Sequence, residues 1–255
     1  MASEPRTVHS VDKAMELLEL LLRRRMPMTL QELSAAVGYP KSTVHALLAT
    51  LRRHEMVRQN DDGRYALGIR LFECGCAVAE GWDVSRVARP YLERLAAQTG
   101  ASAFISVLEG DHAISLDQCA GGDGLQVIPE VGSRLPLHAT AQGKLFLSQL
   151  SESDAMQRLQ RSGMTAYTPH TVTDPAALLR ALEPIRRDGY AVENGEYKIG
   201  LRAAAAPVSD RSGKVRYALG VVGLFRRVES AEFQYAAEQT ILLARQLSQA
   251  LGASV

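Results

Sequence analysis

Residues 29–54 read TLQELSAAVGYPKSTVHALLATLRRH, and this stretch decides the fold of the N-terminal part of the chain. Thr29 followed by Glu32 matches a capping box, which begins a helix. Gly38 breaks that helix, and apolar residues at helical spacing predict a second helix from about Lys41 to His54. Two short helices joined by a glycine-containing turn indicate a helix-turn-helix.

The flanking segments extend this motif on both sides. Apolar residues at helical spacing predict an earlier helix that starts with Ser10 as its N-cap and stops before Pro27. After Glu55 the apolar period becomes two, and Asp62-Gly63 predicts the turn of a hairpin. A hairpin directly after a helix-turn-helix is the wing of a winged helix-turn-helix, which we assign to residues 1–67.

A winged helix-turn-helix indicates binding to double-stranded DNA, because the major groove admits one α-helix. The N-terminal end of the second helix carries small polar residues and cations, and arginines lie farther along it and after the wing turn. Such side chains contact base edges and phosphates, although they are also typical of a solvated helix face. The candidate DNA contacts are Lys41, Ser42, Thr43, His45, Arg52, Arg53 and Arg64.

The rest of the chain predicts a linker helix over residues 68–82 and a second domain over residues 83–255. Helices and strands alternate irregularly there, which is typical of an α+β fold. Helices are expected from Asp83 as N-cap to about residue 99, and over 140–149, 152–161, 175–187 and 230–250. Strands are expected at 103–108, 113–118, 125–128, 190–193, 202–208 and 216–224.

Composition excludes several classes of protein. The chain of 255 residues has three cysteines, no secretory leader and no run of 18 apolar residues, so we expect a cytoplasmic protein that does not span a membrane. None of the six histidines is spaced for a metal site, and we expect no cofactor. The first 70 residues carry 11 Lys and Arg against 8 Asp and Glu, while the rest carry 18 against 20, which is compatible with DNA contact by the first domain.

Several segments together resemble the IclR family of bacterial transcription regulators, over nearly the whole chain. They are SVDKAMELLELL, LQELSAAVGYPKSTVHALLATL and DDGRYALG in the first domain, and residues 132–144, 187–194 and 200–207 in the second. The resemblance implies a GAF-like effector domain, a curved antiparallel sheet flanked by helices. It also implies a homodimer or homotetramer on an operator, and small organic acids or aromatic compounds as effectors.

The same resemblance implies where the effector binds. Ala141 and Gln142, just before Gly143, match a backbone turn that holds it, Glu193 matches an acidic position, and Leu201 matches an apolar wall. Where cysteine is common in the family this chain has Ala203, and it lacks hydroxyls at Gly220 and Val222, which favours a larger and partly apolar ligand. The implied effector residues are Arg134, His138, Ala141, Gln142, Gly143, Glu193, Leu201, Ala203, Gly220 and Val222.

Other functions remain as alternatives. Gly143-Lys144 does not make a phosphate loop, because the pattern needs glycine at His138 and Ser or Thr at Leu145; Gly143 instead indicates a close approach of two backbones. Glu193 and Glu196 are a conceivable catalytic pair in an enzyme fused to a DNA-binding domain, but no nucleophile with an adjacent base is visible. A constitutive DNA-binding protein is a third possibility. We expect no enzyme, and a repressor rather than an activator.

Overall fold

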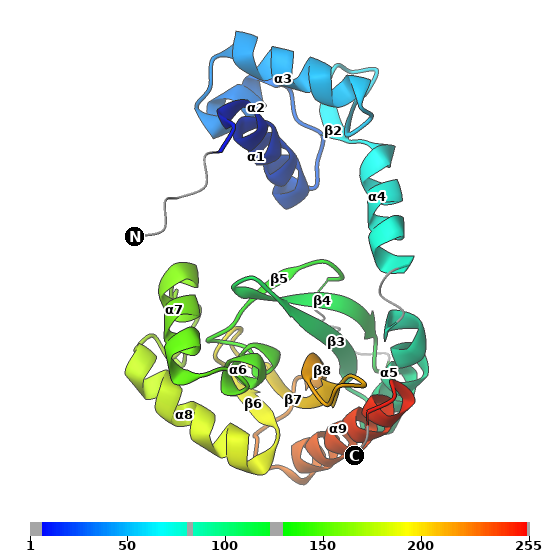
Figure 1. Ribbon diagram of the computed structural model, residues 1–255, viewed down its shortest axis with the longest axis vertical. Helices are drawn as coiled ribbons and strands as arrows, with labels where there is room; N and C mark the ends of the chain where they lie inside the picture. Colours follow the sequence, from blue (N-terminus) through cyan, green and yellow to red (C-terminus); the bar gives the residue numbers. More distant parts are fainter. Residues whose placement is uncertain (1–6, 81–83, 123–129, 254–255) are drawn as a thin grey trace. The chain divides into compact units, whose positions relative to one another are not determined.

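The computed structural model of the protein describes residues 7–80, 84–122 and 130–253, and the chain divides into two compact units, Met1–Trp82 and Asp83–Val255 (Figure 1). The expected N-cap Asp83 and the expected strand 125–128 lie outside the described residues. Among the described helices, none is both long and apolar enough to cross a membrane. The described residues also contain no cluster of three His, Cys, Asp or Glu side chains placed to hold a metal ion.

The first unit has the expected winged helix-turn-helix. Its elements are α1 (His9–Arg24), α2 (Leu30–Val37), α3 (Lys41–Arg53), β1 (Val57–Gln59), β2 (Tyr65–Leu67) and α4 (Ile69–Glu80). The capping box of α2 is confirmed, since the Glu32 backbone N–H donates to Thr29 Oγ1 at 3.2 Å and the Thr29 N–H donates to Glu32 Oε2 at 2.7 Å. The apolar faces of these elements meet in one core of Leu17, Leu20, Leu21, Leu33, Val44, Leu48, Val57 and Tyr65.

The expected N-cap of α1 is wrong. The helix begins one residue before Ser10, at His9, and its cap is Val8 in extended conformation, without a side-chain hydrogen bond. The Val8 carbonyl already accepts from the N–H groups of Val11 and Asp12, at 2.8 and 3.1 Å. Ser10 therefore lies inside the first turn, where its hydroxyl cannot take the place of a cap.

The second unit is a six-stranded antiparallel sheet between two layers of helices, so the α+β assignment is confirmed (Figure 1). The strand order is β5-β4-β3-β8-β7-β6. The strands are β3 (Ser102–Glu109), β4 (His112–Cys119), β5 (Arg134–Pro136), β6 (Ala191–Asn194), β7 (Arg202–Ser209) and β8 (Val215–Gly223). The helices are α5 (Val84–Thr99), α6 (Ala141–Ser148), α7 (Glu152–Ser162), α8 (Pro175–Asp188) and α9 (Ala231–Ala250).

Each face of the sheet has its own core. Helices α5 and α9 cover one face and pack around Leu92, Leu95 and Phe233. Helices α6, α7 and α8 cover the other face, where Phe104 from β3 joins leucines of α6 and α8. Strand β5 was not predicted, because three residues ending in a proline are too short to show a period of two.

Candidate functional site

The turn before α3 is fixed by side chains of the neighbouring elements. Gly38 ends α2 with a positive φ of 74°, and Ser34 Oγ donates to the Tyr39 carbonyl at 2.6 Å. The Tyr39 hydroxyl donates to Glu16 Oε2 of α1 at 2.5 Å. These bonds hold the start of α3 rigidly relative to α1 and α2, as a helix that enters a DNA groove requires.

Several of the predicted DNA contacts are exposed on α3. Lys41, Ser42 and His45 are exposed near its N-terminus, and Arg53 is exposed in its last turn. Pro40 precedes the helix and offers no side-chain cap, so first-turn N–H groups are free to donate to a phosphate. In residues 7–80, the side chains of Lys41, His45 and Arg53 form no hydrogen bond or ion pair within the chain.

The remaining predicted DNA contacts have other surroundings. Thr43 is half-buried. Arg52 donates to Gln59 Oε1 of the hairpin at 2.7 Å. The Arg64 guanidinium lies 3.6 Å from Glu32 and 3.5 Å from Asp62, so it joins the wing to α2. Arg58, exposed on β1, is a cation that the sequence reasoning did not select, although its alternation with buried Val57 was a usable signal.

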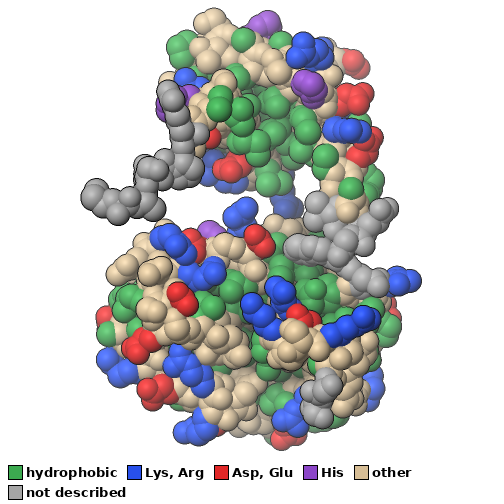
Figure 2. Space-filling model, in the orientation of Figure 1, with side chains coloured by type: hydrophobic (Ala, Val, Ile, Leu, Met, Phe, Trp, Pro, Cys, Tyr) green, Lys and Arg blue, Asp and Glu red, His purple; other side chains and the backbone are tan. Residues whose placement is uncertain are grey.

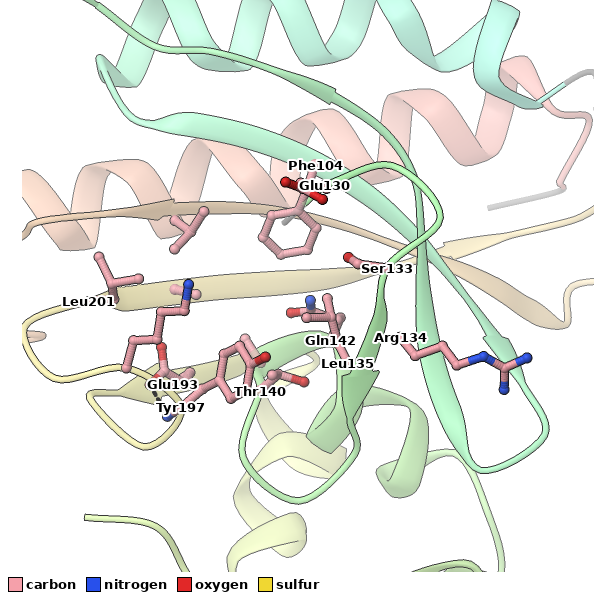
Figure 3. A pocket seen from close by; sticks show the side chains of 14 residues that line it. Phe104, Glu130, Ser133, Arg134, Leu135, Thr140, Gln142, Glu193, Tyr197 and Leu201 are labelled. Atoms are coloured by element: carbon pink, nitrogen blue, oxygen red, sulfur yellow. Dashed lines mark hydrogen bonds between the residues drawn. The ribbon is translucent and has the colours of Figure 1, made fainter. Parts of the chain in front are cut away.

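The second unit contains a cavity of about 260 Å³ between the sheet and α6 (Figure 3). Seven of the implied effector residues line it: Arg134, Ala141, Gln142, Glu193, Leu201, Ala203 and Val222. Seven further lining residues were not expected: Phe104, Glu130, Ser133, Leu135, Thr140, Tyr197 and Lys198. Figure 3 shows the Arg134 side chain directed away from the other labelled residues, so its guanidinium lies at the rim.

Three implied residues do not line the cavity. His138 is buried with Nε2 3.0 Å from the Thr165 carbonyl oxygen, and its ring stacks on Tyr167, which contacts the ring of Tyr197 edge-on. Gly143 is packed against the chain before it, since a Cβ there would lie 2.5 Å from the carbonyl oxygen of Leu137. The predicted close backbone approach at Gly143 is confirmed. Gly220 lies beneath the ring of Phe104.

The N-terminus of α6 opens onto the cavity. Thr140 is its N-cap and accepts from the Gly143 N–H at 3.2 Å, while Thr140 Oγ1 donates to the Pro136 carbonyl at 2.7 Å. Within the described chain, the N–H groups of Ala141 and Gln142 have no acceptor, as the first N–H groups of a helix normally lack one. Such a terminus attracts an anion, because the N–H groups and the helix dipole favour negative charge.

Glu193 is the buried acidic group of the cavity wall and is only 3% exposed. Its Oε1 accepts from the backbone N–H groups of Glu196 at 2.5 Å and of Tyr197 at 3.1 Å. Burial removes water from the carboxylate and raises the pKa of Glu193 to about 7, although these two hydrogen bonds act in the opposite direction.

A buried ion pair holds the segment 195–200, which carries the lining residues Tyr197 and Lys198. Lys144 Nζ of α6 lies 2.5 Å from Glu196 Oε1, and the two side chains are 9% and 12% exposed. The carbonyls of Gly195 and Glu196 also accept from the hydroxyls of Thr168 at 2.7 Å and Thr171 at 2.6 Å, respectively. Glu196 is therefore a structural anchor, which argues against the catalytic pair with Glu193.

Comparisons with known proteins identify the architecture. A family model described as "Bacterial transcriptional regulator IclR C-terminal" matches residues 76–249, and one described as "IclR helix-turn-helix domain" matches residues 10–61. The chain belongs to the IclR family of bacterial transcriptional regulators. The resemblance seen in the sequence is confirmed, and as an IclR-family regulator the chain combines a DNA-binding helix-turn-helix with the family's C-terminal domain.

Individual IclR-family proteins match over almost their whole length. HTH-type transcriptional regulator XynR of Escherichia coli (strain K12) is 33% identical over 246 residues, which are 96% of this chain and 98% of that protein. Transcriptional repressor IclR of the same strain is 31% identical over 257 residues, 99% of this chain and 94% of that protein. The crystal structure of an IclR homologue from Microbacterium hydrocarbonoxydans, complexed with 4-hydroxybenzoate, has the same fold with a TM-score of 0.82, 24% identity, and coverage of 96% of this chain and all of that one.

Proposed function

We propose that a small organic acid with an apolar body binds the cavity of the second unit and thereby changes the affinity of the first unit for its operator. The observation that carries this proposal is the α6 N-terminus, whose free Ala141 and Gln142 N–H groups open onto a cavity with an apolar far wall. A ligand carboxylate is placed at these N–H groups. The apolar body then contacts Phe104, Leu201 and Val222.

Polar side chains orient the ligand in this arrangement. Gln142 is 3% exposed and its amide forms no hydrogen bond within the described chain, so it is free to bind a polar substituent. Lys198 lines the same cavity and favours a negatively charged ligand. The 4-hydroxybenzoate of the Microbacterium protein has an acid group, an apolar ring and a polar substituent, which is the chemistry that this cavity suits.

The experiment that tests the proposal measures binding of the full chain to DNA from the intergenic region next to its gene, with and without a panel of aromatic and aliphatic carboxylic acids. At least one acid is expected to change the dissociation constant by fivefold or more, within the usual range of coupling between two sites. The same acid should raise the melting temperature, because it binds the folded protein only. If no acid alters either quantity, ligand control through this cavity is refuted.

Removing a cation from the exposed side of α3 is expected to weaken operator binding. Lys41→Ala and Arg53→Ala each remove a side chain that has no partner among the described residues. Each should lower affinity by about tenfold and reduce the slope of log affinity against log salt concentration by about one. Arg245→Ala, which removes an exposed cation of α9, is the matched control and should leave binding unchanged. Fluorescence anisotropy at several salt concentrations measures all three, and equal binding by all of them would contradict this surface.

We also propose that the chain works as a homodimer or homotetramer, with α1 in the contact. Val11, Met15 and Leu22 are 56%, 51% and 57% exposed on this helix. Figure 2 shows hydrophobic side chains gathered on the face of the first unit where α1 lies. Such a patch is typical of a surface that associates, and sedimentation equilibrium distinguishes dimer, tetramer and monomer.

Repression is the proposed direction of control, as in the relative named transcriptional repressor. A bound regulator represses when its operator overlaps the promoter, so a promoter fusion in a deletion strain tests the direction of control. Expression should rise without the regulator, and a fall would indicate an activator.

We also propose that the chain has no enzymatic activity. A protein that binds the bacterial chromosome acts in the cytoplasm.

A further inference from the structure

The ring of Phe104 and the missing side chain of Gly220 form a cross-strand pair under the cavity. Phe104 of β3 is directly opposite Gly220 of β8 in the sheet register. A Cβ at Gly220 would lie 2.3 Å from Cζ and 2.8 Å from Cε2 of the Phe104 ring. The ring therefore lies over the glycine, in the space that any other residue at position 220 would fill.

This arrangement determines where the ring stops and the cavity begins. Phe104 is 1% exposed and lines the cavity (Figure 3), so the ring face that is not on the glycine borders the ligand space. The flanking residues of this sheet face, Ala203 and Val222, have small side chains and line the same cavity. On the side of the cavity formed by the sheet, the bulkiest group is therefore the ring of Phe104, which lies against Gly220.

We propose that the Phe104–Gly220 pair sets the depth of the cavity and limits the ligand to an acid with a single ring. This inference rests on the proposed function and names the ligand size that the same site selects. The volume of about 260 Å³ lies just below the 300–1,000 Å³ typical of drug-sized ligand sites, so the cavity suits a small ligand. Shortening Phe104 opens the space over Gly220 to a larger ligand.

The test compares benzoate with 2-naphthoate, by isothermal titration of the full-length protein. The wild type is expected to bind benzoate more tightly than 2-naphthoate. In Phe104→Leu and Phe104→Ala the ratio of the two dissociation constants should move toward 2-naphthoate by at least tenfold, the discrimination that a small volume change in an apolar pocket gives. A ratio that stays unchanged in both variants, while the wild type still binds benzoate, overturns this inference alone.

Phe146→Leu is the matched control. Phe146 is 2% exposed and packs in the same core, on α6, but it does not line this cavity. Phe146→Leu loses the same atoms as Phe104→Leu and should keep the wild-type ratio of the two dissociation constants. It therefore separates a change of ligand space from general loosening of the core. If the wild type binds neither these two acids nor any acid of the panel, the inference and the proposed ligand control fail together.

Discussion

Lys144→Met is expected to destabilise the second unit by about 3–5 kcal/mol, because it leaves the carboxylate of Glu196 buried without its counter-charge. The two side chains are nearly inaccessible to water, and within the part of the chain that the structure describes Glu196 Oε2 has no hydrogen-bond partner. For a unit of this size such a loss lowers the melting temperature by about 6–20 °C. Calorimetry of the full chain measures the shift.

A double variant shows whether the charge or the packing causes the effect. Lys144→Met together with Glu196→Leu removes both charges and should recover most of the lost stability, because an ion pair replaced by apolar residues is often neutral or better. Arg187→Ala is the control for an exposed pair, since the Arg187–Asp188 ion pair is solvated and should contribute little. If Lys144→Met melts like the wild type, the buried pair does not anchor the segment 195–200.

Glu193→Gln is expected to remove a pH dependence from the stability of the second unit. Burial raises the pKa of Glu193 from 4.5 to about 7, so between these pH values the folded protein keeps a proton that the unfolded chain has lost. The free energy of unfolding of the wild type therefore falls as pH rises from about 4.5 to about 7, by about 3 kcal/mol from this group. Glutamine cannot ionise but still accepts from the N–H groups of Glu196 and Tyr197, so the variant should be the more stable protein at pH 8.

Three other carboxyls have pKa values shifted in the opposite direction. Arginine partners lower the pKa of the Asp111 and Asp188 carboxyls, and a serine and an arginine lower that of Asp210. Because their pKa values are lowered, these groups make stability rise with pH at pH values below the window of Glu193, which is the opposite sign. Denaturant unfolding at pH 5 and pH 8 measures the difference. If the free energy of unfolding changes equally between pH 5 and pH 8 in the wild type and in Glu193→Gln, Glu193 is ionised at both pH values.

Local patterns in the sequence predicted most elements of both units. The capping box at Thr29 and the Asp62-Gly63 turn place α2 and the hairpin, because the signal and the structure it determines lie within a few residues. The three-residue strand β5 was not predicted, because it is defined by its pairing with β4 and not by a local pattern. The false cap at Ser10 shows that a suitable side chain does not fix a helix start by itself.

The site was harder to predict than the fold. The family resemblance led to Gln142 and Glu193, but it did not lead to Phe104, which reaches the cavity from a distant part of the chain, or to Tyr197, which lies between Glu193 and Leu201 in the sequence. A sequence shows the charge of Arg52 and Arg64 but not their partners Gln59 and Glu32. Partners of this kind are set by tertiary packing, which leaves no periodic pattern in the sequence.

The pairing of β3 with β8 has a consequence for newly made molecules. Residues 102–109 leave the ribosome long before residues 215–223, and the cavity needs side chains from both strands. The first unit comprises residues 1–82 and has its own core, so it folds while the rest is still being translated. Each nascent polypeptide therefore passes through a period in which it has a folded DNA-binding unit but no cavity, and the cavity is complete only after synthesis of β8.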